Sequence, residues 1–335
     1  MLASSRYGPT SARASANERA GERQRAPREA GFNATSASEP RARQARTQHM
    51  LPGVSDQRVV ALLGVGVVPA DMPILRADDL GAVRGDGIFE TMHVRDGQAW
   101  LLDEHLDRMQ RSASRMELSL PARGGLVELV SQALAPWPAT TEGGLRLVCT
   151  RGAEDGGDVT VFATVFPVPA GNLRGRHHGV SVATATLGFS AELRSGTPWL
   201  LGGAKTLSYA VNMASLRWAQ SVGADDVLWV SSDGYALEAP TSTLLWRSGD
   251  TLCTVPVERT GILAGTTGRW LLDHADELGW STEERMITPA GLATTDGAWF
   301  TSSVRGVAGI RTVDGSEVPY STDLTGRIRA LLGYP

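Results

Sequence analysis

The sequence has 335 residues, of which 42% are hydrophobic and 20% charged, the ordinary balance of a globular protein of about two domains. The net charge of −4 is unevenly divided, because residues 1–50 hold nine arginines against four glutamates, whereas residues 51–335 hold 23 basic and 32 acidic residues. This acidic body argues against nucleic-acid binding. No apolar run approaches the ~20 residues of a membrane span, so no membrane association is expected. Two cysteines make no disulfide framework, which predicts a reducing, cytoplasmic location.

The first fifty residues differ in composition from the rest of the chain. They are rich in Arg, Ser, Ala and Pro and poor in large apolar residues, so they have little apolar surface with which to fold. We expect residues 1–50 to be a disordered N-terminal extension. One alternative is that the start codon was assigned too early and that translation begins at Met50. Another is that the segment is an organelle transit peptide.

Periodic apolar residues separated by turn signals begin near residue 58 and predict an α/β domain over residues 51–170. The expected elements, in chain order, are strands over 59–63 and 67–68, a hairpin joining 84–94 to 98–102 across Asp96-Gly97, a helix capped by Asp103 and reaching Met116, a helix over 125–134, and strands over 145–150 and 159–168. A Pro-, Gly- and Arg-rich stretch at 167–179 then predicts a linker.

The second half of the chain predicts a larger α/β domain over residues 171–335. Its expected elements are strands over 180–185, 226–230 and 235–237 and near Leu244 and Leu252, helices over 206–223 and 266–280, a strand over 298–302, a hairpin across Asp314-Gly315 and a helix from Asp323. The fold class expected from the whole pattern is therefore α/β (α+β) with two domains.

The most informative count concerns lysine. The chain holds 31 arginines and a single lysine, Lys205, which stands between a glycine pair and a predicted helix. Arginine can replace lysine as a positive charge but cannot lose its proton and act as a nucleophilic amine. Lys205 is therefore a candidate for covalent chemistry with a carbonyl compound, although a leftover surface lysine in a GC-rich gene is the alternative.

Two further segments carry candidate chemistry. Glu238 follows a short apolar strand and could place a carboxylate in a site, or be an ordinary solvated loop residue. Residues 261–270, GILAGTTGRW, put a glycine and two threonines at a helix start, where backbone N–H groups, hydroxyls and the helix dipole favour a phosphate. A plain helix cap is the alternative there.

The order of these motifs resembles the class IV aminotransferases, the fold type IV family of pyridoxal-phosphate enzymes. The resemblance rests on RGDGIFETMHVRDG, LLDEHLDRMQRSA, the lysine, GYALE and GILAGTTGRW, in that order, and it covers about residues 55–320. It implies a two-domain fold similar to that of D-amino-acid aminotransferases, pyridoxal 5′-phosphate as cofactor and a homodimer. Within the family, KTLSYAVNMAS most resembles actinobacterial aminodeoxychorismate lyases.

The resemblance also assigns roles to individual residues. Lys205 matches the Schiff-base lysine and general base, and Glu238 matches the acid at the pyridine nitrogen. Further expected cofactor ligands, all at the phosphate, are Arg108, Thr266, Thr267 and Ser303, with Ser302 as an alternative register. The substrate-binding candidates are Phe89, Thr91, Arg146, Arg151 and Tyr209.

Two departures from the family patterns bear on the reaction. Branched-chain enzymes carry Tyr-x-Arg where this chain has Gly144-Leu145-Arg146, and D-amino-acid enzymes carry Arg-x-His where residues 151–159 have neither residue after Arg151. The expected activity is therefore the lyase reaction of folate biosynthesis, 4-amino-4-deoxychorismate to 4-aminobenzoate and pyruvate. The alternative is transamination of branched-chain or D-amino acids with a 2-oxo acid acceptor.

No metal site is expected from the sequence. His93 and the His177-His178 pair lack cysteine or carboxylate partners at ligand spacing, so they are interpreted as structural or solvated residues. The expected partners are a small-molecule substrate and a second copy of the chain, with no nucleic acid.

Overall fold

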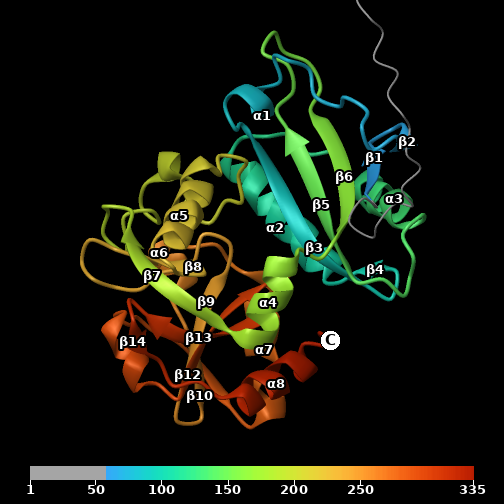
Figure 1. The fold of residues 1–335 in the computed structure, drawn as a ribbon. Helices are drawn as coiled ribbons and strands as arrows, with labels where there is room; N and C mark the ends of the chain where they lie inside the picture. Colours follow the sequence, from blue (N-terminus) through green and yellow to red (C-terminus); the bar gives the residue numbers. More distant parts are fainter. Residues whose placement is uncertain (1–57) are drawn as a thin grey trace, which may run out of the picture. The chain divides into compact units, whose positions relative to one another are not determined.

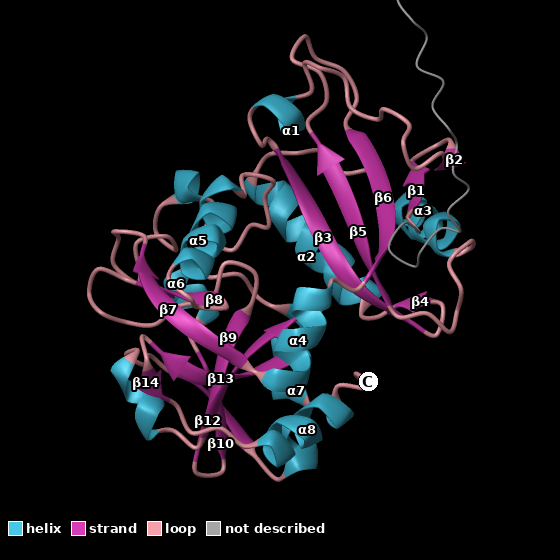
Figure 2. Ribbon diagram, in the orientation of Figure 1, coloured by secondary structure: helices cyan, strands magenta, loops and turns pink. Residues whose placement is uncertain are grey.

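The computed structural model describes residues 58–335, and the expected disordered extension at 1–50 lies outside the described residues. Residues 58–335 lie in one compact unit and build two β-sheets (Figures 1 and 2). No helix among residues 58–335 is both long and apolar enough to cross a membrane.

The first sheet has six strands in the order β2-β1-β6-β5-β3-β4, and each neighbouring pair is antiparallel. Its strands are β1 (Val59–Leu62), β2 (Gly66–Val68), β3 (Gly87–Arg95), β4 (Gln98–Ala99), β5 (Gly143–Thr150) and β6 (Thr160–Pro167), and its helices are α1 (Leu80–Val83), α2 (Leu102–Arg115) and α3 (Arg123–Leu134). Helices α2 and α3 cover one face, where Ile88, Met92, Met109, Leu129 and Leu145 form a dry core. The opposite face of β3 and β5 carries Phe89, Thr91 and Arg146.

The second sheet has eight strands, with β11-β10-β9-β12-β13-β7-β8 in line and β14 paired to β13. Its strands are β7 (Val180–Thr186), β8 (Asp226–Val230), β9 (Thr243–Ser248), β10 (Thr251–Thr254), β11 (Ser281–Glu284), β12 (Gly297–Ser302), β13 (Gly306–Val313) and β14 (Ser316–Glu317). The helices are α4 (Ala170–His178), α5 (Ala210–Ser221), α6 (Val257–Thr260), α7 (Thr266–Asp273) and α8 (Thr322–Leu331), with short 3-10 turns at Pro198–Leu200, Ala275–Leu278 and Ala290–Thr294. Apolar clusters lie on both faces of this sheet.

Both hairpins expected from Asp-Gly pairs are present. Asp96 and Gly97 join β3 to β4 with φ angles of 53° and 72°, and Asp314 and Gly315 join β13 to β14 with φ angles of 49° and 79°. Positive φ at both central residues gives a turn whose twist matches that of the flanking strands, which is why Asp-Gly is favoured there.

Three helix predictions need correction at their boundaries. Helix α2 begins at Leu102, so Asp103 is not the N-cap but lies in the first turn. There its carboxylate interacts favourably with the positive end of the helix dipole. Helix α5 begins only at Ala210, because residues 205–207 are extended and pair with β3. The α-helix expected over 266–280 ends at Asp273, and a separate 3-10 turn follows at Ala275–Leu278.

The stretch expected to be a linker contains helix α4. Pro169 stands at its N-cap, and Arg176 in its last turn donates hydrogen bonds to the carbonyls of Val304 and Arg305, which fixes the helix to the second sheet. The division into domains of residues 51–170 and 171–335 stays a prediction. We propose it because each sheet takes its strands from one side of α4.

Candidate active site

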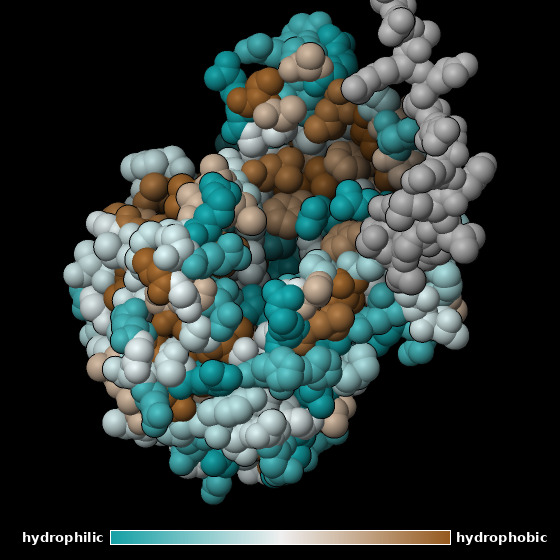
Figure 3. All heavy atoms as spheres, in the orientation of Figure 1, coloured by the Kyte–Doolittle hydropathy of each residue, from teal (hydrophilic) through white to brown (hydrophobic). Residues whose placement is uncertain are grey.

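A cavity of about 1430 Å³ lies between the face of the first sheet opposite α2 and α3 and the second sheet. Its first wall is Phe89 and Thr91 from β3, Arg146 from β5 and Phe166 from β6. The facing wall comes from the segment before α5, the β8–β9 connection, the start of α7 and the β12–β13 turn. Figure 3 shows apolar residues on the sheet above a hollow with a polar interior.

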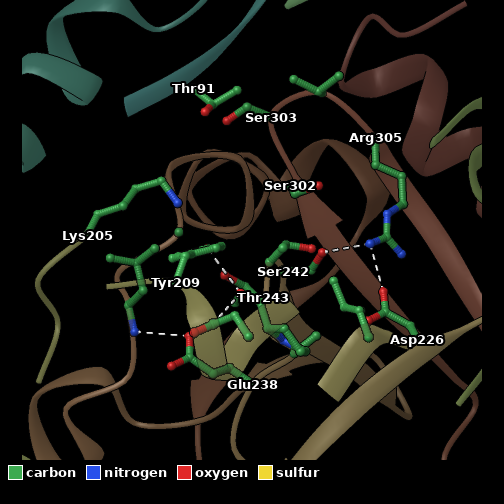
Figure 4. Close-up of a pocket in the computed structure, with 18 of the residues that line it drawn as sticks. Thr91, Lys205, Tyr209, Asp226, Glu238, Ser242, Thr243, Ser302, Ser303 and Arg305 are labelled. Atoms are coloured by element: carbon green, nitrogen blue, oxygen red, sulfur yellow. Dashed lines mark hydrogen bonds and ion pairs between the residues drawn. The ribbon is translucent and has the colours of Figure 1, made fainter. Parts of the chain in front are cut away.

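The single lysine faces this cavity (Figure 4). Its carbonyl accepts a hydrogen bond from the Phe89 amide at 3.1 Å, and its own amide donates to Ser112 Oγ at 3.0 Å, so the backbone of Lys205 is fixed between β3 and α2. The amine lies 4.4 Å from the centre of the Phe89 ring. Burial, with the positive charge of Arg108, lowers the pKa of Lys205 to about 8, so a substantial fraction of the amine is neutral near pH 8.

Glu238 lies across the cavity from Lys205, in the connection between β8 and β9 (Figure 4). One carboxylate oxygen accepts from Arg194 Nη1 at 3.3 Å and the other from the Leu263 amide at 3.1 Å. Burial raises the pKa of Glu238, and these two donors oppose that rise. The carboxylate is thus held in place and can pair with a cationic ring nitrogen in the cavity.

The N-terminus of α7 forms an anion cradle at one end of the cavity. No side chain caps this helix, and Gly265, Thr266 and Thr267 at its start all line the cavity. Within residues 58–335, Thr267 Oγ1 is buried without a hydrogen-bond partner. A Cβ on Gly265 would collide with Thr243, so only glycine lets the helix approach β9 this closely. Uncapped N–H groups and an orphaned hydroxyl fit a phosphate.

Arg108 adds a positive charge beside this cradle. Its side chain is nearly buried, its Nε and Nη2 donate to the two carboxylate oxygens of Glu90 at 2.8 and 2.6 Å, and its Nη1 donates to the Ala264 carbonyl at 2.9 Å. Three of the five guanidinium N–H groups are therefore engaged within the protein, which leaves two for a ligand. Arg108 also lines the cavity, so it is a fixed donor for an anion at the start of α7.

Ser303 joins the same cradle from the β12–β13 turn, and its hydroxyl lies 3.3 Å from His105 Nε2. The neighbouring Ser302 also lines the cavity (Figure 4). The four expected phosphate ligands, Arg108, Thr266, Thr267 and Ser303, thus come together from three separate segments of the chain.

The substrate-binding candidates divide into two groups. Phe89, Thr91, Arg146 and Tyr209 line the cavity, and the Arg146 guanidinium lies 6.0 Å from the Phe89 ring centre and 5.3 Å from that of Phe166. Arg151 does not line it, because its side chain is held by Asp86 and by the carbonyls of Met116 and Glu117.

Comparison with known proteins decides the family. A family model described as amino-transferase class IV matches residues 87–313, which is more than half of the chain. The chain belongs to the class IV aminotransferase family. The resemblance seen in the sequence is thereby confirmed.

Several relatives in this family match the chain over most of its length. A bifunctional aminodeoxychorismate lyase / D-amino acid transaminase of Mycobacterium tuberculosis is 42% identical over 269 residues, which is 78% of this chain and 93% of that protein. A hypothetical aminotransferase from Mycobacterium tuberculosis, solved in its PLP-bound form, is 40% identical with a TM-score of 0.78, covering 82% of this chain and 98% of the other. A fold IV transaminase from Curtobacterium pusillum is 35% identical, also with a TM-score of 0.78, over 82% of this chain and 99% of the other. The expected α/β fold type IV is confirmed.

Three residues of the candidate active site escaped the sequence interpretation: Glu90, His105 and Arg194. Two of them had a signal, because Glu90 interrupts the buried face Ile88–Met92–Val94 of a strand, and His105 stands three residues before Arg108 on the apolar face of α2. A buried carboxylate needs a partner of this kind. No sequence signal pointed to Arg194, since it lies in an irregular segment and contacts Glu238 only in the folded structure.

Residues 58–335 of this class IV aminotransferase contain no cluster of His, Cys, Asp or Glu that could hold a metal ion. His93 is buried and bonds Glu142 at 2.7 Å, while His177 is exposed beside Arg329. These histidines therefore have structural or surface positions within the described part of the chain.

Proposed function

We propose that this protein is an aminodeoxychorismate lyase, which converts 4-amino-4-deoxychorismate to 4-aminobenzoate and pyruvate. The observation that carries the proposal is Arg146, a guanidinium that lines the cavity between the rings of Phe89 and Phe166 and has no carboxylate partner among the described residues. A cation flanked by aromatic rings suits a substrate that bears a carboxylate on a flat ring. The name of the 42% identical relative includes the same activity.

Pyridoxal 5′-phosphate is the cofactor, as expected from the family and from the relative solved with it bound. The residues that would hold it are Lys205 through its amine, Glu238 at the pyridine nitrogen, and Arg108 with the start of α7 at the phosphate. When bound, the cofactor withdraws electrons from the carbon atom that carries the substrate amine.

Lys205 performs the proton transfers. Its amine takes the proton from C4 of the substrate, and the bond between the neighbouring ring carbon and the enolpyruvyl oxygen breaks. The enolpyruvate that leaves takes up a proton on its methylene carbon and becomes pyruvate. The remaining ring becomes aromatic, which favours the products. The pKa of about 8 makes Lys205 a base that works near neutral pH, whereas an ordinary lysine would stay protonated.

Glu238 would stabilise the cofactor, and Arg146 would position the substrate. The Glu238 carboxylate, held by Arg194 and the Leu263 amide, favours a protonated pyridine nitrogen. Arg146 would bind the substrate carboxylate and orient C4 toward the Lys205 amine. Phe166 shapes the same wall. A Cβ on Gly144 would lie 2.7 Å from its ring, so a tyrosine at this position, as in branched-chain enzymes, would require the Phe166 ring to move.

Transamination is the second candidate. The same relative is named as a D-amino acid transaminase as well as a lyase, and a lysine base beside the cofactor suits both reactions. In a transaminase, Lys205 would move a proton from the amino-acid Cα to the cofactor, and a 2-oxo acid would complete the cycle. A single enzyme could carry both activities in the same cavity.

The test supplies 4-amino-4-deoxychorismate to the holoenzyme without any 2-oxo acid. We expect many turnovers, with 4-aminobenzoate and pyruvate formed in equal amounts, and none with Lys205→Ala. Turnover that appears only when D-alanine and 2-oxoglutarate are supplied would replace the lyase assignment with the transaminase.

The proposal includes a homodimer in the cytoplasm. Large apolar side chains lie exposed on α5 and on the 3-10 turn Pro198–Leu200, which suits contact with a second copy: Trp199, Leu200, Val211, Met213 and Trp218. Light scattering of the wild type and of Trp199→Glu with Met213→Glu tests this, since the double variant should be monomeric. A wild type that is itself monomeric at micromolar concentration would contradict the homodimer.

A further inference from the structure

A row of buried polar groups runs from β3 to the anion cradle and has no part in the proton transfers described above. Glu90 and His105 are both 0% exposed. His105 Nδ1 lies 2.7 Å from Glu90 Oε2, and on the other side of the ring Nε2 lies 3.2 Å from Thr266 Oγ1 and 3.3 Å from Ser303 Oγ. One imidazole therefore joins a buried carboxylate to two of the expected phosphate ligands.

The carboxylate decides where the ring hydrogen lies. Burial alone would raise the pKa of Glu90, but the charges and hydrogen bonds of Arg108 and His105 hold it well below its ordinary value, so Glu90 is an anion. An anion accepts hydrogen bonds, so His105 Nδ1 carries a hydrogen and donates it. In a neutral ring Nε2 is then an acceptor and faces the hydroxyls of Thr266 and Ser303.

A phosphate in the cradle conflicts with that arrangement. Each hydroxyl has one hydrogen, and a hydroxyl that donates it to His105 Nε2 turns only lone pairs toward the cavity. Nε2 of the neutral ring has one lone pair and accepts from one of the two hydroxyls, so that hydroxyl has no hydrogen left for the phosphate. If both hydroxyls donate to the phosphate dianion, Nε2 faces oxygen lone pairs. Protonation of Nε2 removes the conflict, because Nε2–H donates to a hydroxyl oxygen and that hydroxyl donates to the phosphate.

The charges around His105 are compatible with a neutral ring before binding and a charged ring after it. Burial lowers the pKa of His105, Glu90 raises it, and Arg108 and Lys205 lower it further, with the net direction downward. From α7 and the β12–β13 turn, the described residues that bond the ring are the uncharged Thr266 and Ser303. A phosphate dianion would be a second negatively charged group near the ring, beside Glu90.

We propose that His105 takes up a proton from solvent when the cofactor phosphate enters the cradle, so that Glu90, His105 and the two hydroxyls form a proton-coupled phosphate site. No bond between heavy atoms changes in this step. The inference rests on the proposed function only in that α7, Arg108 and Ser303 receive the phosphate. His105 is a positioning residue, because it acts on the phosphate through Thr266 and Ser303.

The test measures protons directly. The full-length protein is freed of cofactor and titrated by calorimetry at pH 8 with pyridoxine 5′-phosphate, which has no aldehyde and cannot bond to Lys205, in three buffers of different ionisation enthalpy. At pH 8 the phosphate monoester is already a dianion. We expect the wild type to take up about one proton more than His105→Gln, whose amide can donate to the hydroxyls without titrating. The control His177→Gln, on the exposed side of α4, should match the wild type.

Two other results overturn parts of the scheme separately. Equal proton uptake in wild type and His105→Gln, with both binding, would reject the proton-coupled site and leave the phosphate assignment intact. Failure of the wild type to bind pyridoxine 5′-phosphate would reject the cradle and with it the proposed function.

A measurement on the wild-type holoenzyme does not depend on the variant folding. Ordinary histidines are neutral at pH 8, so the nitrogen-15 spectrum should contain one doubly protonated imidazole. A spectrum in which every histidine ring is neutral at pH 8 would contradict the proposal.

Discussion

The amine of Lys205 lies 4.4 Å from the ring centre of Phe89, although the two residues are 116 positions apart in the sequence. The contact follows from backbone pairing, since the Phe89 amide donates to the Lys205 carbonyl and the Leu207 amide donates to the Gly87 carbonyl at 2.8 Å. The reactive amine is therefore aimed by strand geometry, with the aromatic face favouring its cationic form modestly.

Because Lys205 is the only lysine, borohydride reduction of the holoenzyme should leave the cofactor on a single side chain. Mass spectrometry of a digest should show one modified peptide, the one that contains Lys205. Lys205→Arg keeps the charge but has no titrating amine. The variant should therefore lack the cofactor absorbance, and its kcat should fall by roughly a thousandfold or more. Substantial activity in Lys205→Arg would mean that the lone lysine is incidental.

The lowered pKa of Lys205 predicts a pH dependence for cofactor attachment. Only the neutral amine attacks the aldehyde, so the rate at which cofactor-free protein captures pyridoxal phosphate should rise roughly tenfold per pH unit below pH 8 and level off above it. Stopped-flow absorbance gives this rate. A rise that continues to pH 10 would show that the amine has an ordinary pKa.

Arg146 and Arg151 provide a matched pair five positions apart. Arg146→Gln removes a charge that lines the cavity, so kcat/KM for the substrate should fall roughly 10- to 100-fold, as for the loss of a charge-assisted hydrogen bond. Arg151→Gln acts on the contact with Asp86 and should leave kcat/KM unchanged while lowering the melting temperature slightly. The reverse pattern in steady-state kinetics would exchange their roles.

Replacing Arg108 should affect both stability and cofactor affinity. Arg108→Ala leaves the buried Glu90 carboxylate without its bidentate partner, so the free energy of unfolding should fall by about 3–5 kcal/mol. Adding Glu90→Gln should recover part of that stability but none of the affinity for pyridoxal phosphate. Denaturant unfolding and cofactor titration measure the two quantities, and affinity equal to the wild type in Arg108→Ala would remove Arg108 from the phosphate site.

Tyr334 should contribute to stability and to the shape of the anion cradle. Its hydroxyl donates to the Ser303 carbonyl at 2.5 Å, and its ring stacks on His93 at 4.4 Å between centres. Tyr334→Phe should lower the free energy of unfolding by about 1 kcal/mol and Tyr334→Ala by about 3–5 kcal/mol. Thermal unfolding checks both, and no change in Tyr334→Ala would show that the ring contributes nothing.

Local chemistry explains which features could be predicted from the sequence. The Asp96-Gly97 turn and the helix start at Thr266 depend on neighbouring residues, and both are found as expected. The start of α5 could not be predicted, because residues 206–207 have a helical pattern but pair with a strand more than a hundred positions earlier. The partnership of Arg194 with Glu238 likewise exists only in the folded chain.

The pairing of residues 205–207 with β3 also affects how the chain could be divided. Ile88 and Thr206 form a β-bridge, so the edge of the first sheet at 87–89 is completed by a segment from the other side of α4. A protein split within α4 would therefore give two fragments that complement each other, the first with an unpaired edge and the second with an unanchored lysine. Such fragments should be inactive apart and regain activity when mixed, which makes α4 a natural position for a split-enzyme reporter.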